Sequence, residues 1–174
     1  MKPVVVLLAM TAAAAADPAP SRLTAAMHVG GAYTRAGDDT SRGYGWGLSF
    51  ELEGGAFLTD RLAGVAFARV EPTFGTHYSN GDSIRDFKVH YGARFHAFVA
   101  PTVFAGVGIG RLDEIRSHFG THEHDSALAI EAHLGAGIGH INTALVDAVI
   151  EIGRANYADP GAAAWGRLAI GIRW

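Results

Sequence analysis

Apolar side chains alternate with small or polar ones, position by position, in segments spread along the chain. In the segment GYGWGLSFELEG, apolar residues occupy the even positions from Tyr44 to Leu52, and glycine, serine and glutamate occupy the odd ones. The last segment, GRLAIGIRW, repeats this pattern from Leu168 to Trp174. A period of two indicates β-strands whose two faces meet different surroundings, because successive side chains point to opposite sides. The chain is therefore predicted to be all-β.

Eight strands are predicted from this pattern, and the connections between them alternate in length. The short connections read LTD, APT and INT; the longer ones are AGDDTS, two segments that contain FGTH, and NYADPG. Tight turns at one end and longer loops at the other are typical of outer-membrane barrels. The predicted strands cover residues 23–35, 42–57, 62–73, 84–99, 102–112, 126–140, 144–154 and 162–174. We therefore predict an eight-stranded antiparallel up-and-down transmembrane β-barrel as one domain over residues 23–174.

A repeated unit accompanies these strands. The segments AGVAFARVE, from Ala63 to Glu71, and AGVGIGRLD, from Ala105 to Asp113, are each followed by FGTH. A fainter copy, DAVIEIGRA, covers residues 147–155. A period of roughly forty residues suits a unit of two strands and their connections. The sequence therefore predicts a duplicated hairpin, with both FGTH segments in outer loops.

The N-terminal segment MKPVVVLLAMTAAAAA combines one cation, Lys2, with a short apolar core and an alanine run. This pattern is that of a secretory signal peptide, and the apolar stretch is too short for a membrane helix. We predict a signal peptide over residues 1–16 and a short linker over residues 17–22. The alternative is an apolar helical N-terminus without a role in export.

The composition excludes several classes of partner. The chain has 14 basic and 17 acidic residues, so we expect no nucleic acid as a partner. It contains no cysteine, which excludes a disulfide, a thiolate metal site and an acylated cysteine anchor. No cofactor is predicted.

The polar face of the predicted strands is rich in glycine and carries charges of both signs. These features indicate the inside of a narrow barrel, where ion pairs and small residues fill the space. Alternation alone also fits a soluble β-sandwich or a lipocalin-like barrel, so these folds remain alternatives. The residues of the predicted luminal ion-pair set are Glu51, Lys88, Arg94, Glu131, His133, Asp147, Glu151 and Arg167. Because eight strands leave an interior just filled by side chains, a diffusion pore is not expected. The alternative is that the charged luminal group around Glu131 and His133 transfers protons or acts as a general acid and base.

The apolar face and the C-terminus carry a family resemblance. Aromatic residues stand toward one end of the predicted outer wall, at Tyr44, Trp46, Phe87 and Tyr91, and Trp174 stands at the other. The terminal aromatic follows apolar residues at alternate positions, namely Leu168, Ile170 and Ile172. In these features the chain resembles the small eight-stranded outer-membrane barrels of the OmpA transmembrane domain, OmpX and opacity-type proteins. The resemblance implies location in the cell outer membrane, assembly by the barrel-assembly machinery through Trp174, and a monomer.

Arginine recurs at the ends of the predicted strands. In four of them it stands two positions after an apolar residue, as in the pair Ile109 and Arg111. Guanidinium groups form paired hydrogen bonds with phosphates, so we predict a collar that contacts outer-membrane lipid and lipopolysaccharide. The collar residues are Arg35, Arg42, Arg69, Arg85, Arg111 and Arg154. The alternative is that these long cations only reach toward water at a membrane interface.

The segment RSHFGTHEHDS suggests a metal site in an outer loop. It places His118, His122 and His124 beside Glu123 and Asp125. Imidazole nitrogen and carboxylate oxygen are ligands for zinc, nickel or copper. A polar loop without metal is the alternative, because histidine-rich tracts are only compositional.

An enzymatic alternative comes from HYSN, residues 77–80. This tetrapeptide resembles the His-x-Ser-Asn motif of lipid A 3-O-deacylases, which are also eight-stranded barrels; the resemblance implies catalytic roles for His77 and Ser79. A catalytic glutamate follows the motif in that family, and no glutamate follows here before Glu114. The main prediction is therefore a non-catalytic barrel with a structural or adhesin- and receptor-like surface role.

Overall fold

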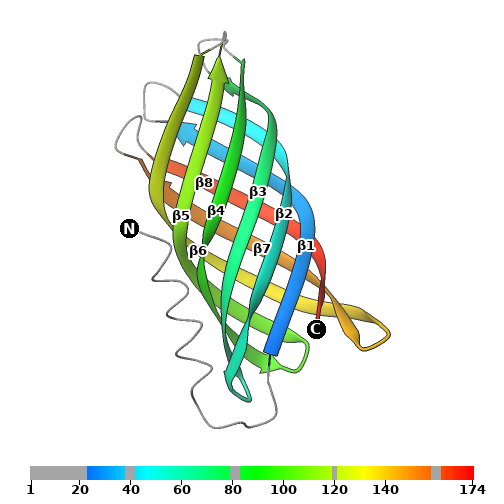
Figure 1. Ribbon diagram of the computed structural model, residues 1–174. Helices are drawn as coiled ribbons and strands as arrows, with labels where there is room; N and C mark the ends of the chain where they lie inside the picture. Colours follow the sequence, from blue (N-terminus) through cyan, green and yellow to red (C-terminus); the bar gives the residue numbers. More distant parts are fainter. Residues whose placement is uncertain (1–22, 38–41, 79–82, 119–120, 158–161) are drawn as a thin grey trace.

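The computed structural model describes residues 23–37, 42–78, 83–118, 121–157 and 162–174. Within these ranges, the side chains of residues 36–37, 42, 75–78, 83–85, 118 and 121–122 lie outside the description. Eight antiparallel strands pair in chain order, and β1 closes the barrel on β8 (Figure 1). The strands are β1 (Leu23–Gly37), β2 (Arg42–Thr59), β3 (Leu62–Tyr78), β4 (Ser83–Ala100), β5 (Val103–His118), β6 (Thr121–Ile141), β7 (Ala144–Asn156) and β8 (Ala162–Arg173). The predicted fold class is confirmed.

At one end of the barrel the strands are joined by tight turns. Only two residues separate β2 from β3, β4 from β5, and β6 from β7. Asn142, in the last of these turns, has a positive φ of 55°, a conformation that asparagine tolerates in a tight hairpin. In the described part of the chain, no helix is long and apolar enough to cross a membrane. The predicted signal peptide and linker, residues 1–22, fall outside the description.

The strands at the opposite end run further than the sequence predicted. β3 continues through the first FGTH segment to Tyr78, and β6 already begins at Thr121, within the second. The backbone of Thr76 pairs with Gly45 of β2 and with Ile84 of β4. The expectation that both FGTH segments form loops is therefore wrong for the first one, because pairing on both sides extends the strand. Phe119 and Gly120 lie outside the described residues.

The side chains of the two duplicated segments face opposite sides of the barrel wall. In β3, Phe67 and Arg69 point into the barrel, whereas the equivalent Ile109 and Arg111 of β5 point outward. Both strands follow two-residue turns, but β5 has one additional residue, Phe104, before its AGV sequence. A shift of one residue moves every side chain of a strand to the other face. Similarity of sequence therefore did not predict orientation.

The barrel has an apolar outside and a polar inside. Outward positions such as Leu52, Val107 and Ile152 are 61%, 61% and 65% exposed. Charged residues such as Glu51, Arg94 and Asp147 are at most 2% exposed. A soluble sandwich or lipocalin-like barrel would bury its apolar face instead. This inverted arrangement is the one that outer-membrane barrels use.

Two apolar clusters lie inside the barrel at different heights. Near the tight turns, Phe98 and Phe104 pack with Ala63 and Val149, and Phe57 lies against them. Toward the opposite end, a second cluster includes Leu112, Tyr157 and Trp165 together with several alanines. Buried charged residues lie between these clusters and also beside them, as shown by the Arg173 guanidinium, which lies 4.5 Å from the ring centroid of Phe104.

Candidate functional site

Arg94 of β4 is the centre of the buried ion-pair network. Its Nη2 atom lies 2.8 Å from Glu51 Oε2 and 2.9 Å from Glu151 Oε2, and its Nη1 atom lies 2.5 Å from Glu53 Oε1. Its Nε atom also donates to Glu131. These four carboxylates come from β2, β6 and β7, so one guanidinium joins strands across the lumen. A fork of five donors suits this role better than a single ammonium group.

Two further arginines complete the centre of this network. Arg167 donates from Nη1 and Nη2 to the two oxygens of Glu51, both at 2.9 Å, and from Nε to Ser49 at 3.0 Å. Arg69 donates to Glu151 and lies 2.8 Å from Glu71. Arg69 is 1% exposed, so it belongs to the lumen. The predicted position of Arg69 in the outer collar is therefore wrong, since the repeat faces inward in β3.

The network extends toward the tight turns through His28 of β1. His28 Nε2 lies 3.0 Å from Asp147 Oδ1, and Arg173 Nε donates to the other oxygen of Asp147 at 3.1 Å. Arg173 also donates to Glu53 at 3.2 Å. His28, Glu53 and Arg173 are not among the luminal residues predicted from the sequence. Strand parity would have found all three, because each lies on the inward-facing row of its strand.

Toward the loop end, the interior holds a smaller group of charges. Lys88 Nζ lies 3.8 Å from Glu114 Oε1, and Arg116 Nη2 lies 3.4 Å from Glu114 Oε2. His133 lies at the other end of the interior, near the tight turns; it is buried at 4% exposure and lies against the rings of His96 and Phe104, at centroid distances of 4.7 Å and 6.1 Å. All eight residues of the predicted luminal set thus lie inside the barrel; seven form ion pairs, and His133 makes ring contacts.

Glycines of β5 provide the room that these long side chains need. A Cβ atom at Gly108 would lie 2.7 Å from Glu131 Oε1 and 2.9 Å from Arg94 Cγ. A Cβ at Gly106 would overlap the ring of His133. Gly106 and Gly108 of β5 therefore leave the space that the side chains of His133, Glu131 and Arg94 occupy.

This interior is suited to holding charges together rather than to reacting with a ligand. In the described part of the chain, one group, His28, Glu51 and Glu53, brings potential metal ligands within 4.8 Å of one another. Guanidinium groups of Arg94 and Arg173 already lie within 3.2 Å of these carboxylates. A cation would have to displace them, so we assign the group to the ion-pair network.

The outer arginines divide into three groups. Arg35, Arg111 and Arg154 are exposed on the outer wall, on β1, β5 and β7. Arg69 lies in the lumen, as described above. Arg42 begins β2, and Arg85 lies near the start of β4. The side chains of both are outside the description.

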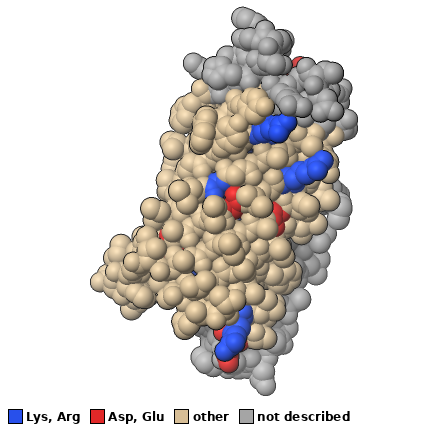
Figure 2. Space-filling view, turned by 180° about the vertical axis from the view of Figure 1, so that it is seen from behind, with Lys and Arg blue, Asp and Glu red and all other residues tan. Residues whose placement is uncertain are grey.

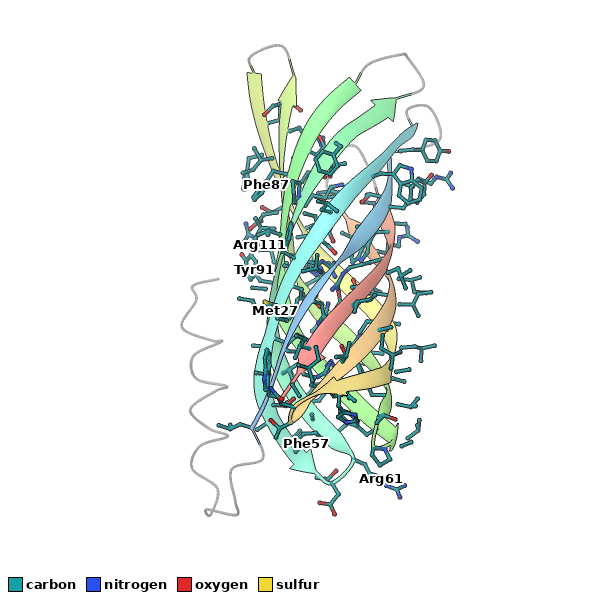
Figure 3. All side chains as sticks on the ribbon, turned by 90° about the vertical axis from the view of Figure 1, so that its right-hand side faces the viewer. Met27, Phe57, Arg61, Phe87, Tyr91 and Arg111 are labelled. Carbon is teal, nitrogen blue, oxygen red and sulfur yellow. The ribbon has the colours of Figure 1, made fainter. Side chains whose placement is uncertain are left out.

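The exposed arginines mark one boundary of an apolar band. Arg111 follows Val103 by eight positions, and Arg154 follows Val146 by eight, with apolar side chains facing outward between them. At about 3.3 Å per residue and a strand tilt of about 40°, eight residues rise about 20 Å. Figure 3 places Arg111 and Arg61 at different heights, with Met27 between them. Figure 2 shows charged side chains of both signs in the upper half of one face and again at its lower end, with a wide, mostly uncharged area between them.

The predicted metal and catalytic residues lie where the description is incomplete. His124 is exposed, and its backbone pairs with Ile115, while the side chains of His118 and His122 are outside the described set. His77 belongs to β3 by its backbone, but its side chain and all of Ser79 are outside it too. The metal and deacylase hypotheses therefore remain predictions.

Together, the closed topology, the apolar outer band and the charged interior define the fold of the small eight-stranded outer-membrane β-barrels. No protein-family model matches the sequence, and no curated protein matches it. Several solved structures of bacterial envelope proteins share this fold.

Three such structures have less than 20% sequence identity to this chain. Ail, the attachment invasion locus protein of Yersinia pestis, in complex with the heparin analogue sucrose octasulfate, matches with a TM-score of 0.54 and 18% identity, over 88% of this chain and 99% of Ail. Neisserial surface protein A matches with a TM-score of 0.59 and 12% identity, over 86% and 95% of the two chains. The N-terminal β-barrel domain of Pseudomonas aeruginosa OprF matches with a TM-score of 0.52 and 16% identity, over 88% and 98%. At these identities, the likeness establishes the fold.

Proposed function

We propose that this protein is an integral outer-membrane barrel with a plugged lumen and a structural or surface-interaction role. The observation that carries this proposal is the inverted barrel: buried ion pairs fill the inside, and an apolar band surrounds the outside. Arg94 and its four carboxylates occupy the middle of the lumen, and Phe98 and Phe104 occupy the end near the tight turns. A path for solutes would require these groups to separate, so the protein is not a diffusion pore.

The loop end supports a surface role. Beyond the level of Arg111, β5 continues to His118, and its backbone stays paired with β6. This part of the sheet stands above the apolar band and would face the cell exterior. Ail is described as an attachment protein and NspA as a surface protein, and an adhesin- or receptor-like role is our proposal for this chain by analogy of fold. Binding residues placed on such loops are held by a rigid scaffold.

The C-terminal residue supports assembly through the usual route for these barrels. Trp174 is 58% exposed, and its backbone exchanges hydrogen bonds of 2.9 Å and 3.2 Å with Ala25 of β1. It therefore lies at the seam where the first and last strands close the barrel. We include recognition of Trp174 by the barrel-assembly machinery, and a monomeric state, in the proposal.

Two measurements test the proposal. The full chain, expressed in a Gram-negative cell, should be found in the outer-membrane fraction, require detergent for extraction and change its gel mobility on boiling. Purified protein in planar bilayers should give no steady conductance. Recovery in the soluble periplasmic fraction would refute the membrane assignment, and a stable ohmic current would refute the plugged lumen.

The surface role requires a separate test. Exchanging the connections at the loop end, residues 38–41, 79–82, 119–120 and 158–161, with those of a barrel that does not bind host cells should transfer any cell binding with the loops. Binding that stays with the strands would contradict the adhesin-like role while leaving the barrel assignment intact.

A further inference from the structure

The three exposed outer arginines, Arg35, Arg111 and Arg154, have different partners. Arg111 differs from the other two. Arg111 Nε donates to Asp113 Oδ1 at 2.8 Å, and Arg111 Nη2 donates to Ser126 Oγ at 2.7 Å. Tyr91 donates to the other oxygen of Asp113 at 3.3 Å. The charge of Arg111 is thus already paired with a carboxylate on the same wall.

Arg35 and Arg154 have neutral partners instead. Arg154 Nε donates to the amide oxygen of Asn156 at 3.1 Å. The guanidinium carbon of Arg35 lies 5.9 Å from the ring centroid of Tyr44. Among the described residues, neither arginine has a carboxylate partner. Within the described part of the chain, both side chains are therefore positioned by contacts with neutral groups.

The same two arginines lie on one row of the sheet, on either side of an alanine. Ala164 of β8 pairs with Arg35 of β1 and with Arg154 of β7. Each strand spacing is about 4.8 Å, so the two arginine Cα atoms lie about 10 Å apart. Ala164 is exposed and has no long side chain to separate the guanidinium groups. Two extended arginine side chains can both donate hydrogen bonds to one tetrahedral anion across this distance.

The height of this row on the barrel indicates which kind of anion it would meet. Below Arg154, the outward side chains of β7 are the apolar Ile152 and Ile150, and those of β8 below Ala164 are Leu168 and Ile170. The row therefore lies at the upper edge of the apolar band, where lipid headgroups meet the barrel. Phosphate is the anionic group that phospholipid and lipid A headgroups share, and arginine binds it with two parallel hydrogen bonds.

We infer that Arg35 and Arg154, across Ala164, form a site for the phosphoryl group of an outer-leaflet lipid. Arg111, neutralised by Asp113, is a structural ion pair rather than a third ligand of this site. Of the predicted collar, Arg35 and Arg154 belong to this site on the wall of β7, β8 and β1, and Arg69 and Arg111 do not. This inference rests on the proposed outer-membrane location.

The test uses full-length barrel refolded in a zwitterionic detergent that carries no phosphomonoester. Native mass spectrometry measures retention of added diphosphoryl lipid A. We expect the wild type to retain one lipid A, the Arg35→Gln/Arg154→Gln variant to lose about tenfold or more in affinity, and Arg111→Gln to stay within about twofold of wild type. Dephosphorylated lipid A should not be retained. Unchanged gel mobility on boiling serves as the control that each variant folds.

Three outcomes would overturn the inference. An equal loss in Arg111→Gln would restore a general cationic collar, and unchanged affinity in the double variant would remove the site. Displacement of lipid A by millimolar inorganic phosphate would assign the site to a free anion rather than to a lipid. Recovery of the protein outside the outer membrane would instead refute the proposed function, so the two failures are distinguishable.

Discussion

Removal of the Arg94 guanidinium is expected to destabilise the barrel more than removal of any exposed cation. Arg94 is 2% exposed, and the variant Arg94→Gln leaves Glu51, Glu53 and Glu151 without their shared partner. The neutral amide replaces five donors with two and leaves several buried negative charges close together. Breaking a buried ion pair by removing one partner costs about 3–5 kcal/mol. We expect a loss in the free energy of unfolding of this size.

Urea unfolding of the refolded barrel, followed by tryptophan fluorescence and by gel mobility without boiling, measures this loss. With an m value of about 2 kcal/mol per molar urea, the midpoint should fall by roughly 1.5–2.5 M. Arg94→Lys should lie between the wild type and Arg94→Gln, because an ammonium group keeps the charge but cannot bridge four carboxylates. Arg61→Gln, at the exposed turn between β2 and β3, is the matched control and should leave the midpoint unchanged.

A decrease below about 1 kcal/mol for Arg94→Gln would refute the reasoning, since such a value is typical of an exposed pair. It would mean that water enters the middle of the lumen and screens the carboxylates. A conductance test of the same variant then decides whether the loss of Arg94 opens a path. A stable variant that also stays closed would show that the apolar clusters alone fill the barrel.

Three further predictions follow from the same geometry. Gly135→Ala should cost about 1–3 kcal/mol in urea unfolding because its Cβ would overlap the Phe104 ring, whereas Gly139→Ala, whose Cβ meets nothing within 4 Å, should leave the midpoint unchanged; equal effects would contradict the packing argument. Trp174→Ala should reduce the fraction of the chain that reaches the folded, heat-modifiable form in cells, and normal assembly of this variant would argue against Trp174 as a recognition element. Mass spectra of lipid A from cells with and without the protein should show the same acyl chains, and a lost chain would revive the deacylase hypothesis.

Strand parity predicted which side chains enter the lumen, because a side chain's face depends only on its position in one strand. The odd positions of β2 supplied Glu51, and those of β8 supplied Arg167. Parity could not predict that these two residues form a bidentate pair, since they are separated by most of the chain and meet through barrel closure. Height along the barrel depends on the register of several strand pairs, which a single sequence does not contain.

The error at Arg69 had a different origin. Arg69 was predicted to face outward because it stands two positions after the apolar Phe67, but Phe67 is itself buried in the lumen at 4% exposure. One additional residue, Phe104, separates the β5 copy from its turn and reverses the orientation of every side chain after it. Counting from the turn, applied to β3 alone, would have placed Arg69 on the inward row with Phe67 and Glu71.

The described part of the outer wall is not uniform. Among the described side chains, the outer surface of β2, β3 and β4 carries aromatic groups toward the loop end, including Trp46 and Phe87 at 68% and 42% exposure. The side chains of Arg42 and Arg85 lie outside this description. The strands β5, β7 and β1 keep their arginines outside. A headgroup site on β7, β8 and β1 would fix which side of the barrel faces a bound lipid and which side presents aromatic residues to the membrane.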